Sequence, residues 1–325
     1  MKPRFPLFRL PNSAIIEVIK NFPLRQLFAF SLVSTKTKDL VSSLGIKTSK
    51  LDICVYNLLH VSMISGESYL GLNFYDESKY RNGLSPIDIT LPVDVCFEYK
   101  GSRMQALIPF NFSDWMNYIR TIFCFTKPPN ISFYGSCEKY GIELLKDTIG
   151  NVNVLFVSHL VTDVMSRTIL KHFNTPNKLF LCKNPFEEAC QIQQTFVQNF
   201  ETIEFDDVHS LDDMLLVNGK KVYFYHATTQ KQFNQFLQHW IRGSNPRLQF
   251  MFLLINKIDV ASEAMYLNGI RCMEMSEDAK TEIRQKHKLP IEVDMIKIKR
   301  KDGTSAVIGT NKSDNIIYFH FIVLH

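Results

Sequence analysis

The feature that most constrains the fold is a run of apolar residues at helical spacing, between residues 7 and 41, that two prolines interrupt. Asn12 and Ser13 follow the first proline and are expected to cap a helix. Proline suits the start of a helix but not the position after a helical residue, so Pro23 should end that helix and begin a second. A third helix should run from about Ser34 to Gly45, where glycine can end it. The stretch therefore predicts three short helices.

Three short helices carry more apolar surface than they can bury against one another, because units below about 40 residues usually need outside help to be stable. The apolar face of this stretch should therefore meet something else. Without a partner, part of it should remain exposed as a patch, and such a patch usually marks a binding site. We expect some of these residues to be exposed: Leu10, Pro11, Ile15, Ile19 and Leu27.

The order of residues here resembles the F-box pattern, which has Leu-Pro, paired aliphatics, Phe-Pro, a leucine-rich turn and a late valine. The matching positions are Leu10, Pro11, Ile15, Val18, Ile19, Phe22, Pro23, Leu27, Phe30 and Val33. The chain departs from the family at Ser13, where an acidic residue is common, and at Thr37, where tryptophan is common.

The resemblance implies that the stretch docks on the small Skp adaptor of cullin ubiquitin ligases. The residues it assigns to adaptor binding are Leu10, Pro11, Ile15, Val18, Ile19, Leu27, Phe30 and Val33. The alternative is an ordinary helical subdomain that packs on the rest of the chain.

Composition bounds the class of protein. With 325 residues the chain is about right for two modules, and its net charge of +5 is below what a dedicated nucleic-acid binder usually shows. No apolar run reaches the roughly 18 residues of a membrane helix, and the first residues lack the core of a signal peptide. The seven cysteines are odd in number and have no C-x-x-C spacing, so we expect reduced thiols, no zinc site and a cytoplasmic or nuclear protein.

Residues 46–126 predict a β-rich segment followed by a helix. Short apolar or alternating runs are separated by turn residues, which is typical of strands. Residues 112–125 predict the helix: Ser113 can cap it, and its apolar residues share one side. The buried residues expected on that side are Trp115, Ile119, Ile122 and Phe123.

Residues 127–290 contain a loose repeat of one apolar strand and one helical link, at steps of 19 to 26 residues. The matching strand positions are Ile131, Val154, Leu179, Ile203, Val222 and Leu248. This period is that of leucine-rich repeats, which stack into a solenoid with parallel strands on one face. We therefore expect an irregular α/β solenoid with the strands adjacent, parallel and in chain order. An open parallel sheet remains the alternative.

Residues 202–255 resemble the type 2 F-box-associated domain, which accompanies an N-terminal F-box in a large nematode-expanded family. The matching segments are Leu211-Asp212-Asp213-Met214-Leu215, then Phe233, Phe236, Leu237 and Trp240, then Gly243 and Asn245-Pro246-Arg247-Leu248. Phe233, Phe236, Leu237 and Trp240 also have the spacing of one buried helical face, so Trp240 should be buried.

Residues 291–325 predict a cluster of strands that caps the solenoid. Val293, Met295 or Ile296, and Ile298 should share one side of the first strand, and Asp302-Gly303 signals a hairpin.

Other motifs carry little chemistry. The chain contains neither a glycine-rich phosphate loop nor a familiar catalytic signature. We read His226 and His239 as packing or surface residues, and the acidic cluster at Asp206, Asp207, Asp212 and Asp213 as a solvated loop and a helix start. The basic run Lys297, Lys299, Arg300 and Lys301 should lie on the solvent face of a strand.

The sequence thus predicts an α/β protein with an F-box at 1–45 and an F-box-associated domain at 46–325, divided into 46–126, 127–290 and 291–325. The expected function is substrate recognition in an Skp–cullin–F-box ubiquitin ligase, without catalytic residues, cofactor or metal, leading to ubiquitin-dependent degradation of a target. Neither the target protein nor the residues that bind it can be named. Two alternatives stay open: a solenoid scaffold without a ligase, and a nucleic-acid-binding module that uses the basic strand.

Overall fold

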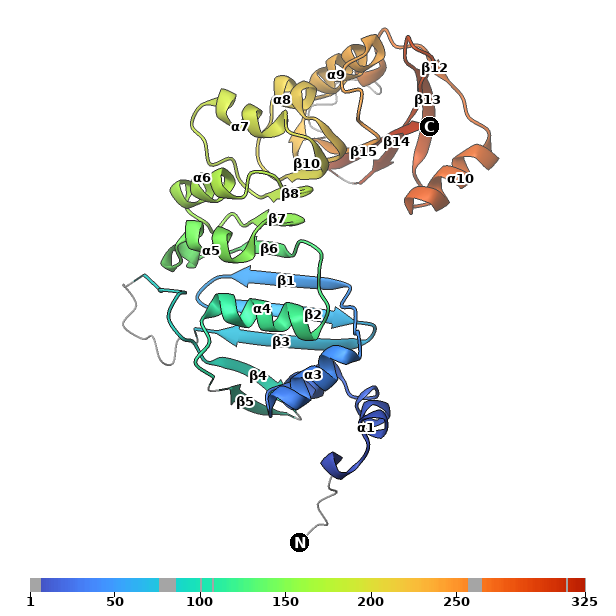
Figure 1. The fold of residues 1–325 in the computed structure, drawn as a ribbon. Coiled ribbons are helices and arrows are strands. Elements are labelled where there is room, and N and C mark those ends of the chain that lie inside the picture. Colours follow the sequence, from blue (N-terminus) through green and yellow to red (C-terminus); the bar gives the residue numbers. More distant parts are fainter. Residues whose placement is uncertain are drawn as a thin grey trace. The chain divides into compact units, whose positions relative to one another are not determined.

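The computed structural model of this chain describes residues 7–75, 86–99, 101–106, 108–256, 265–313 and 315–324. It divides into two compact units, Met1–Pro176 and Asn177–His325, whose elements are labelled in Figure 1. The expected domain boundary at residue 45 falls inside the first unit. The N-terminal helices therefore belong to the same compact body as the strands that follow them.

Three α-helices lie in the proline-broken stretch, after a 3-10 turn, η1 (Leu7–Arg9). They are α1 (Asn12–Ile19), α2 (Leu24–Ser31) and α3 (Thr35–Ser43). The expected cap of α1 is wrong, because the helix already includes Asn12 and Ser13, and Pro11 precedes it without a side-chain hydrogen bond. Gly45 follows α3 with a φ of +61°, the left-handed conformation that glycine adopts readily after a helix.

The first unit has a mixed sheet in the order β7-β6-β1-β2-β3-β4-β5. An antiparallel meander comes first, as β1 (Lys50–Val55), β2 (Leu59–Ser65), β3 (Ser68–Phe74), β4 (Val95–Tyr99) and β5 (Ser102–Ala106). The next two strands, β6 (Asn130–Phe133) and β7 (Val154–Val157), pair parallel beyond β1. The helices between and after these strands are α4 (Phe112–Ile122), η2 (Cys137–Lys139), α5 (Ile142–Ile149) and α6 (Asp163–His172).

The N-terminal cap of helix α4 lies two residues before the position expected from the sequence. Asn111, rather than Ser113, caps the helix: its side chain accepts a hydrogen bond from Asp114 N at 2.9 Å, and Asp114 accepts one from Asn111 N at 3.1 Å. Ser113 lies within the first turn. The four residues expected to be buried, Trp115, Ile119, Ile122 and Phe123, are all buried.

The second unit also has a mixed sheet, in the order β12-β13-β14-β15-β11-β10-β9-β8. Its parallel strands are β8 (Lys178–Leu181), β9 (Phe200–Phe205), β10 (Gly219–Thr228) and β11 (Phe250–Asn256). Its antiparallel strands are β12 (Cys272–Met273), β13 (Asp294–Lys299), β14 (Ser305–Lys312) and β15 (Ile316–Leu324). The helices are α7 (Ala189–Phe196), α8 (Leu211–Leu216), α9 (Gln230–Arg242), η4 (Met265–Leu267) and α10 (Glu277–His287).

The repeat expected from the sequence is present only in part. Strands β6 and β7 in the first unit, and β8 to β11 in the second, are parallel and in chain order. Antiparallel strands occupy the rest of each sheet, so the structure does not establish a solenoid. Two matching positions were out of register: Ile131 pairs with Leu155 rather than Val154, and Val222 pairs with Met251 rather than Leu248.

The core of the second unit lies where α9 meets β15. Trp240 is fully buried, and its ring lies edge-on to that of Phe321 at 5.0 Å. Phe233 packs in the same way on Phe319, at 4.9 Å. The burial predicted from the helical spacing of Phe233, Phe236, Leu237 and Trp240 is therefore confirmed.

Replacing Trp240 with alanine should lower the free energy of unfolding by about 3–5 kcal/mol, because the cavity left at α9 cannot close against a strand. Urea unfolding followed by circular dichroism measures the change. Val208→Ala, at an exposed position of the same unit, is the control and should change the stability by less than about 0.5 kcal/mol. Equal midpoints for the Trp240 variant and the parent would contradict the packing described here.

Candidate functional site

Helix α2 is fixed to the first unit by Phe28, which is fully buried. Its ring lies edge-on to Phe97 of β4 at 5.2 Å, and it also contacts Trp115 and Tyr118 of α4 at 6.3 and 6.4 Å. Two hydrogen bonds tie the ends of the helix. Leu24 N donates to Ser68 Oγ at 2.8 Å, and the Tyr118 hydroxyl donates to Ser31 Oγ at 3.0 Å. One face of the helices therefore meets the protein's own sheet.

Other apolar residues of this stretch lie outside the buried face, on η1, on the segment that leads into α1, on α1 and α2, and on the turn after α2. Phe8 is 49% exposed, Val18 41% and Val33 65%, and Pro11 is also exposed. Phe8 stacks on the half-buried Phe30 at 6.2 Å. We call six residues the outer apolar set: Phe8, Leu10, Pro11, Val18, Phe30 and Val33.

The structure separates the eight residues that the resemblance assigned to adaptor binding. Ile15, Ile19 and Leu27 are buried, so they serve the core of the helices and offer no surface. Pro11, Val18 and Val33 are exposed, while Leu10 and Phe30 are half-buried. Ile15, Val18 and Ile19 lie on α1 and Leu27 and Phe30 on α2, whereas Leu10, Pro11 and Val33 lie outside the helices. Helical spacing does not distinguish a helical face that meets the sheet from one that meets solvent. Phe8 was not among the candidates, although an aromatic residue just before Leu-Pro was a usable signal.

Thr37 occupies the position where the family commonly has tryptophan, and it is fully buried. It is the third residue of α3 and completes a capping box with Ser34. Thr37 N donates to Ser34 Oγ at 3.2 Å, Ser34 N donates to Thr37 Oγ1 at 2.9 Å, and the Thr37 hydroxyl lies 2.7 Å from Ser34 O. Thr37 therefore supplies the second bond of the capping box, from Ser34 N to its own Oγ1, which a tryptophan side chain at this position could not accept.

Residues of the matching segments make contacts that stabilise the second unit. Asn245, at a φ of +50°, places Nδ2 at 3.1 Å from the carbonyl oxygens of Met214 and Val217 and 3.2 Å from that of Leu215. These are the last carbonyls of α8, which have no partner within the helix. Asn245 thus joins the end of α8, which carries the matching segment Leu211 to Leu215, to the turn that precedes β11.

The basic run is only partly on the solvent face. Lys299 and Lys301 are exposed, but Lys297 is half-buried, and the Arg300 side chain is only 10% exposed. The Arg300 guanidinium lies over the Trp240 ring, 5.5 Å from its centroid, and donates to Gly243 O. The expectation that Arg300 faces solvent is therefore wrong, because alternation along a strand ends where the β13–β14 turn begins.

The acidic cluster is explained by helix capping and loop hydrogen bonds. Asp213 is buried and accepts hydrogen bonds from Ser210 N at 2.7 Å and Gln193 Nε2 at 3.2 Å. Asp207 accepts one from Asn184 N at 2.8 Å. Among the residues that the structure describes, no group of three histidine, cysteine or acidic side chains could hold a metal ion.

His226 is exposed and His239 is half-buried, whereas His209 is buried and was not singled out. Its ring stacks on Phe224 at 4.2 Å. Burial, the largest cause, lowers the pKa of His209 to about 4. His209 is therefore held neutral as a core residue.

No helix in the described part of the chain is long and apolar enough to cross a membrane. None of the seven cysteines, all of which the structure describes, forms a disulfide bond.

Comparison with known proteins agrees with both resemblances. Residues 7–49 match the F-box domain family and residues 191–253 match the family described as F-box associated. Domains of these two families are typically non-catalytic interaction modules. No solved structure matches the chain.

Two curated relatives from Caenorhabditis elegans match over nearly the full length. The F-box associated domain-containing protein sdz-33 is 22% identical, covering 99% of this chain and 98% of its own. The Skn-1 dependent zygotic transcript 15 protein is 25% identical, covering 94% of each.

Asn245→Ala should lower the free energy of unfolding by about 1–3 kcal/mol, because it leaves buried carbonyls of α8 without a donor. Urea unfolding of the purified chain measures it. Asn218→Ala is the control, since that side chain is half-buried but its amide bonds only Val197 O and Asn199 Oδ1. If both variants unfold at the parent's urea concentration, Asn245 does not hold the framework.

His209 should make the second unit less stable in acid. Between its folded pKa of about 4 and its ordinary 6.5, the unfolded chain binds a proton that the folded chain excludes. Stability is therefore full above pH 6.5 and falls by up to about 3 kcal/mol as the pH drops toward 4. His209→Phe should remove this part of the loss in urea titrations at pH 7.5 and 4.5, whereas the exposed His226→Phe should keep it. A His209 variant with the parent's pH dependence would refute the assignment.

Proposed function

From the premise that this chain is an F-box protein with an F-box-associated domain, we propose that it is a substrate-recognition subunit of a cullin ubiquitin ligase. The outer apolar set docks on the Skp adaptor, and the remainder of the chain holds a target protein for ubiquitin transfer and degradation. The chain itself contributes no catalytic group, cofactor or metal. It acts by raising the effective concentration of the target near the transferring subunits.

The observation that carries this proposal is the division of the helical surface into two faces. Phe28 anchors the inner face to Phe97 and α4, so the helices are held in place without a partner. The outer face keeps Phe8, Val18 and Val33 exposed. These residues lie on η1, on α1 and on the turn after α2, within one short stretch of the chain. Clusters of exposed apolar side chains mark interaction surfaces, and binding energy concentrates in a few anchors.

The same division bears on the alternative of an ordinary helical subdomain. That alternative accounts for Ile15, Ile19 and Leu27, which are buried, but it leaves the outer apolar set without a role. A scaffold without a ligase would use the same outer face for another partner, so only the identity of that partner distinguishes the two.

The nucleic-acid alternative loses support because Arg300 is committed to Trp240 and Gly243 rather than to a basic surface. For location we infer the cytoplasm or the nucleus. The support is chemical, because seven cysteines without a disulfide bond in the described structure suit a reducing compartment.

Val33→Asp should reduce capture of the Skp adaptor by about tenfold or more, because an unpaired carboxylate would be buried in the apolar interface. The matched control is Val164→Asp on α6 of the same unit, since Val164 is 68% exposed and Val33 is 65% exposed. Co-purification with recombinant adaptor, beside a thermal melt, measures both. Both variants should melt like the parent. Equal capture by the two variants would argue against the outer apolar set.

The double change Leu10→Ala and Pro11→Ala should also abolish adaptor capture, since these residues open the F-box-like pattern and lie outside the buried core. The melting of the chain should remain close to that of the parent. If the chain unfolds instead, these two residues serve the fold and the subdomain alternative holds.

A further inference from the structure

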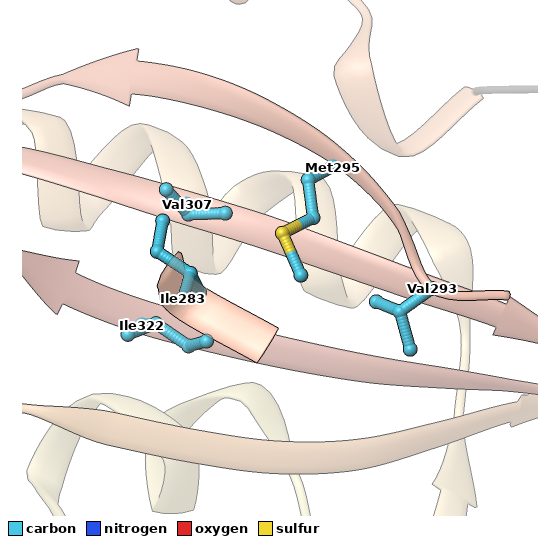
Figure 2. Packing of buried hydrophobic residues seen from close by; sticks show 5 residues of the cluster. All are labelled: Ile283, Val293, Met295, Val307 and Ile322. Atoms are coloured by element: carbon cyan, nitrogen blue, oxygen red, sulfur yellow. The ribbon is translucent and has the colours of Figure 1, made fainter. Parts of the chain in front are cut away.

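The sheet of the second unit is covered differently on its two faces. On one face, Phe196 of α7 packs on Phe205 at 5.2 Å, and Trp240 of α9 packs on Phe321. On the other face, Ile283 of α10 joins a buried cluster with Val293, Met295, Val307 and Ile322, which Figure 2 shows from close by. This cluster lies over β13, β14 and β15. Away from it, the side chains of the second face are only partly buried.

Strand pairing places one residue from each of five neighbouring strands in a single row across this face. Phe180 pairs with Glu204, Glu204 with Tyr223, Tyr223 with Phe252, and Phe252 with His320. All five are half-buried. The row and its neighbours Tyr225 and Tyr318 form what we call the aromatic face.

The rings of the aromatic face contact one another. Tyr225, which is 39% exposed, lies 5.7 Å from Phe252, and Tyr223 and Tyr318 lie 6.3 and 6.2 Å from the same ring. At the margin Phe250 stacks on His287 of α10 at 6.2 Å. These contacts hold a rigid apolar floor in position before any partner binds, which reduces the entropic cost of binding.

Glu204 is the carboxylate in the row. The Tyr225 hydroxyl donates to its Oε2 at 3.3 Å, and no lysine or arginine of the described chain forms an ion pair with it. Burial and the neighbouring Asp206 raise the pKa of Glu204, while the Tyr225 hydrogen bond and Lys178 lower it less. A half-buried carboxylate without a cation is costly, and a cation from outside would offset that cost.

Two comparisons within the protein show that Glu204 is different. Glu201, on the same strand, pairs with Lys220 at 2.8 Å, and the hydrogen bond from that lysine lowers its pKa. In the first unit, Asp52 of β1 pairs with Lys50 at 2.9 Å and accepts a hydrogen bond from Asn130 Nδ2 at 2.7 Å. Glu204 has aromatic neighbours and no such ion pair within the described residues, although Lys178 lies near enough to lower its pKa.

We propose that the aromatic face is the target-binding surface, and that it takes a protein segment whose lysine or arginine side chain sits on Glu204 against Tyr223, Tyr225 and Phe252. The carboxylate supplies the opposite charge, and the aromatic rings attract the cation through their faces and cover its aliphatic part. The link to ubiquitin transfer rests on the proposed function, but the binding itself does not.

The test is selection of peptides from a random 12-residue phage library on the immobilised full chain, without the adaptor. Enriched peptides should share a lysine or arginine at a fixed position. Glu204→Gln, which keeps the shape and removes the charge, should weaken binding of the enriched peptides by about tenfold or more. Glu201→Gln should leave it unchanged. Tyr225→Ala should weaken it several-fold, because a ring face is lost.

The proposal is overturned if no peptide is enriched, if enriched peptides lack a basic residue, or if Glu204→Gln binds them like the parent. It is also overturned if random oligonucleotides bind the aromatic face and compete with the peptides. Adaptor co-purification of Glu204→Gln is measured in parallel and should match the parent. Loss of peptide binding by Glu204→Gln with intact adaptor capture supports this inference. If the parent chain does not capture the adaptor, that result contradicts the proposed function and leaves the peptide test in force.

Discussion

The contact between Phe28 and the pair Phe97 and Trp115 is the interaction on which the first unit depends. Three helices of eight or nine residues cannot build a stable core alone, and this contact lends them the core of the sheet and α4. Phe8, Val18 and Val33, which lie on η1, on α1 and on the turn after α2, remain exposed.

The two faces of the second unit's sheet also differ in their roles. Asn245 joins α8 to the turn before β11, and Trp240 and Arg300 join α9 to the strands at the C-terminal end. Asn245 and Trp240 belong to the segments that match the F-box-associated family, and Arg300 packs on Trp240 from outside that match. On the opposite face, α10 packs over the C-terminal strands through Ile283, and the aromatic face lies beside that cluster. A binding surface can vary there without disturbing the framework, which is where we place the target.

Local sequence patterns predicted many of the helices, strands and buried residues. Features that depend on contacts between distant residues could not be predicted in this way. Helical spacing correctly located the helix with Trp115 and the burial of Trp240, because both follow from periodicity within one element. Periodicity could not show that Ile15, Ile19 and Leu27 are buried while Val18 and Val33 are exposed, since that depends on where a distant sheet lies. The stacking of Arg300 on Trp240 joins residues 60 positions apart and leaves no local signal. The strand register failed at Val154 and Leu248 because turn lengths differ between repeats.

The central claim is that the helices of residues 7–43 have one face committed to the fold and one face free for the adaptor. Hydrogen–deuterium exchange of the full chain, with and without the Skp adaptor, tests it most directly. The account predicts slower exchange on adaptor binding in α1 and α2, with the exchange of α4 and β3 unchanged, because the Phe28 contact persists in the complex. Faster exchange in α4 and β3 would show that α2 leaves the sheet to bind, and unchanged exchange in α1 and α2 would show that the adaptor does not dock there; either result would contradict the account.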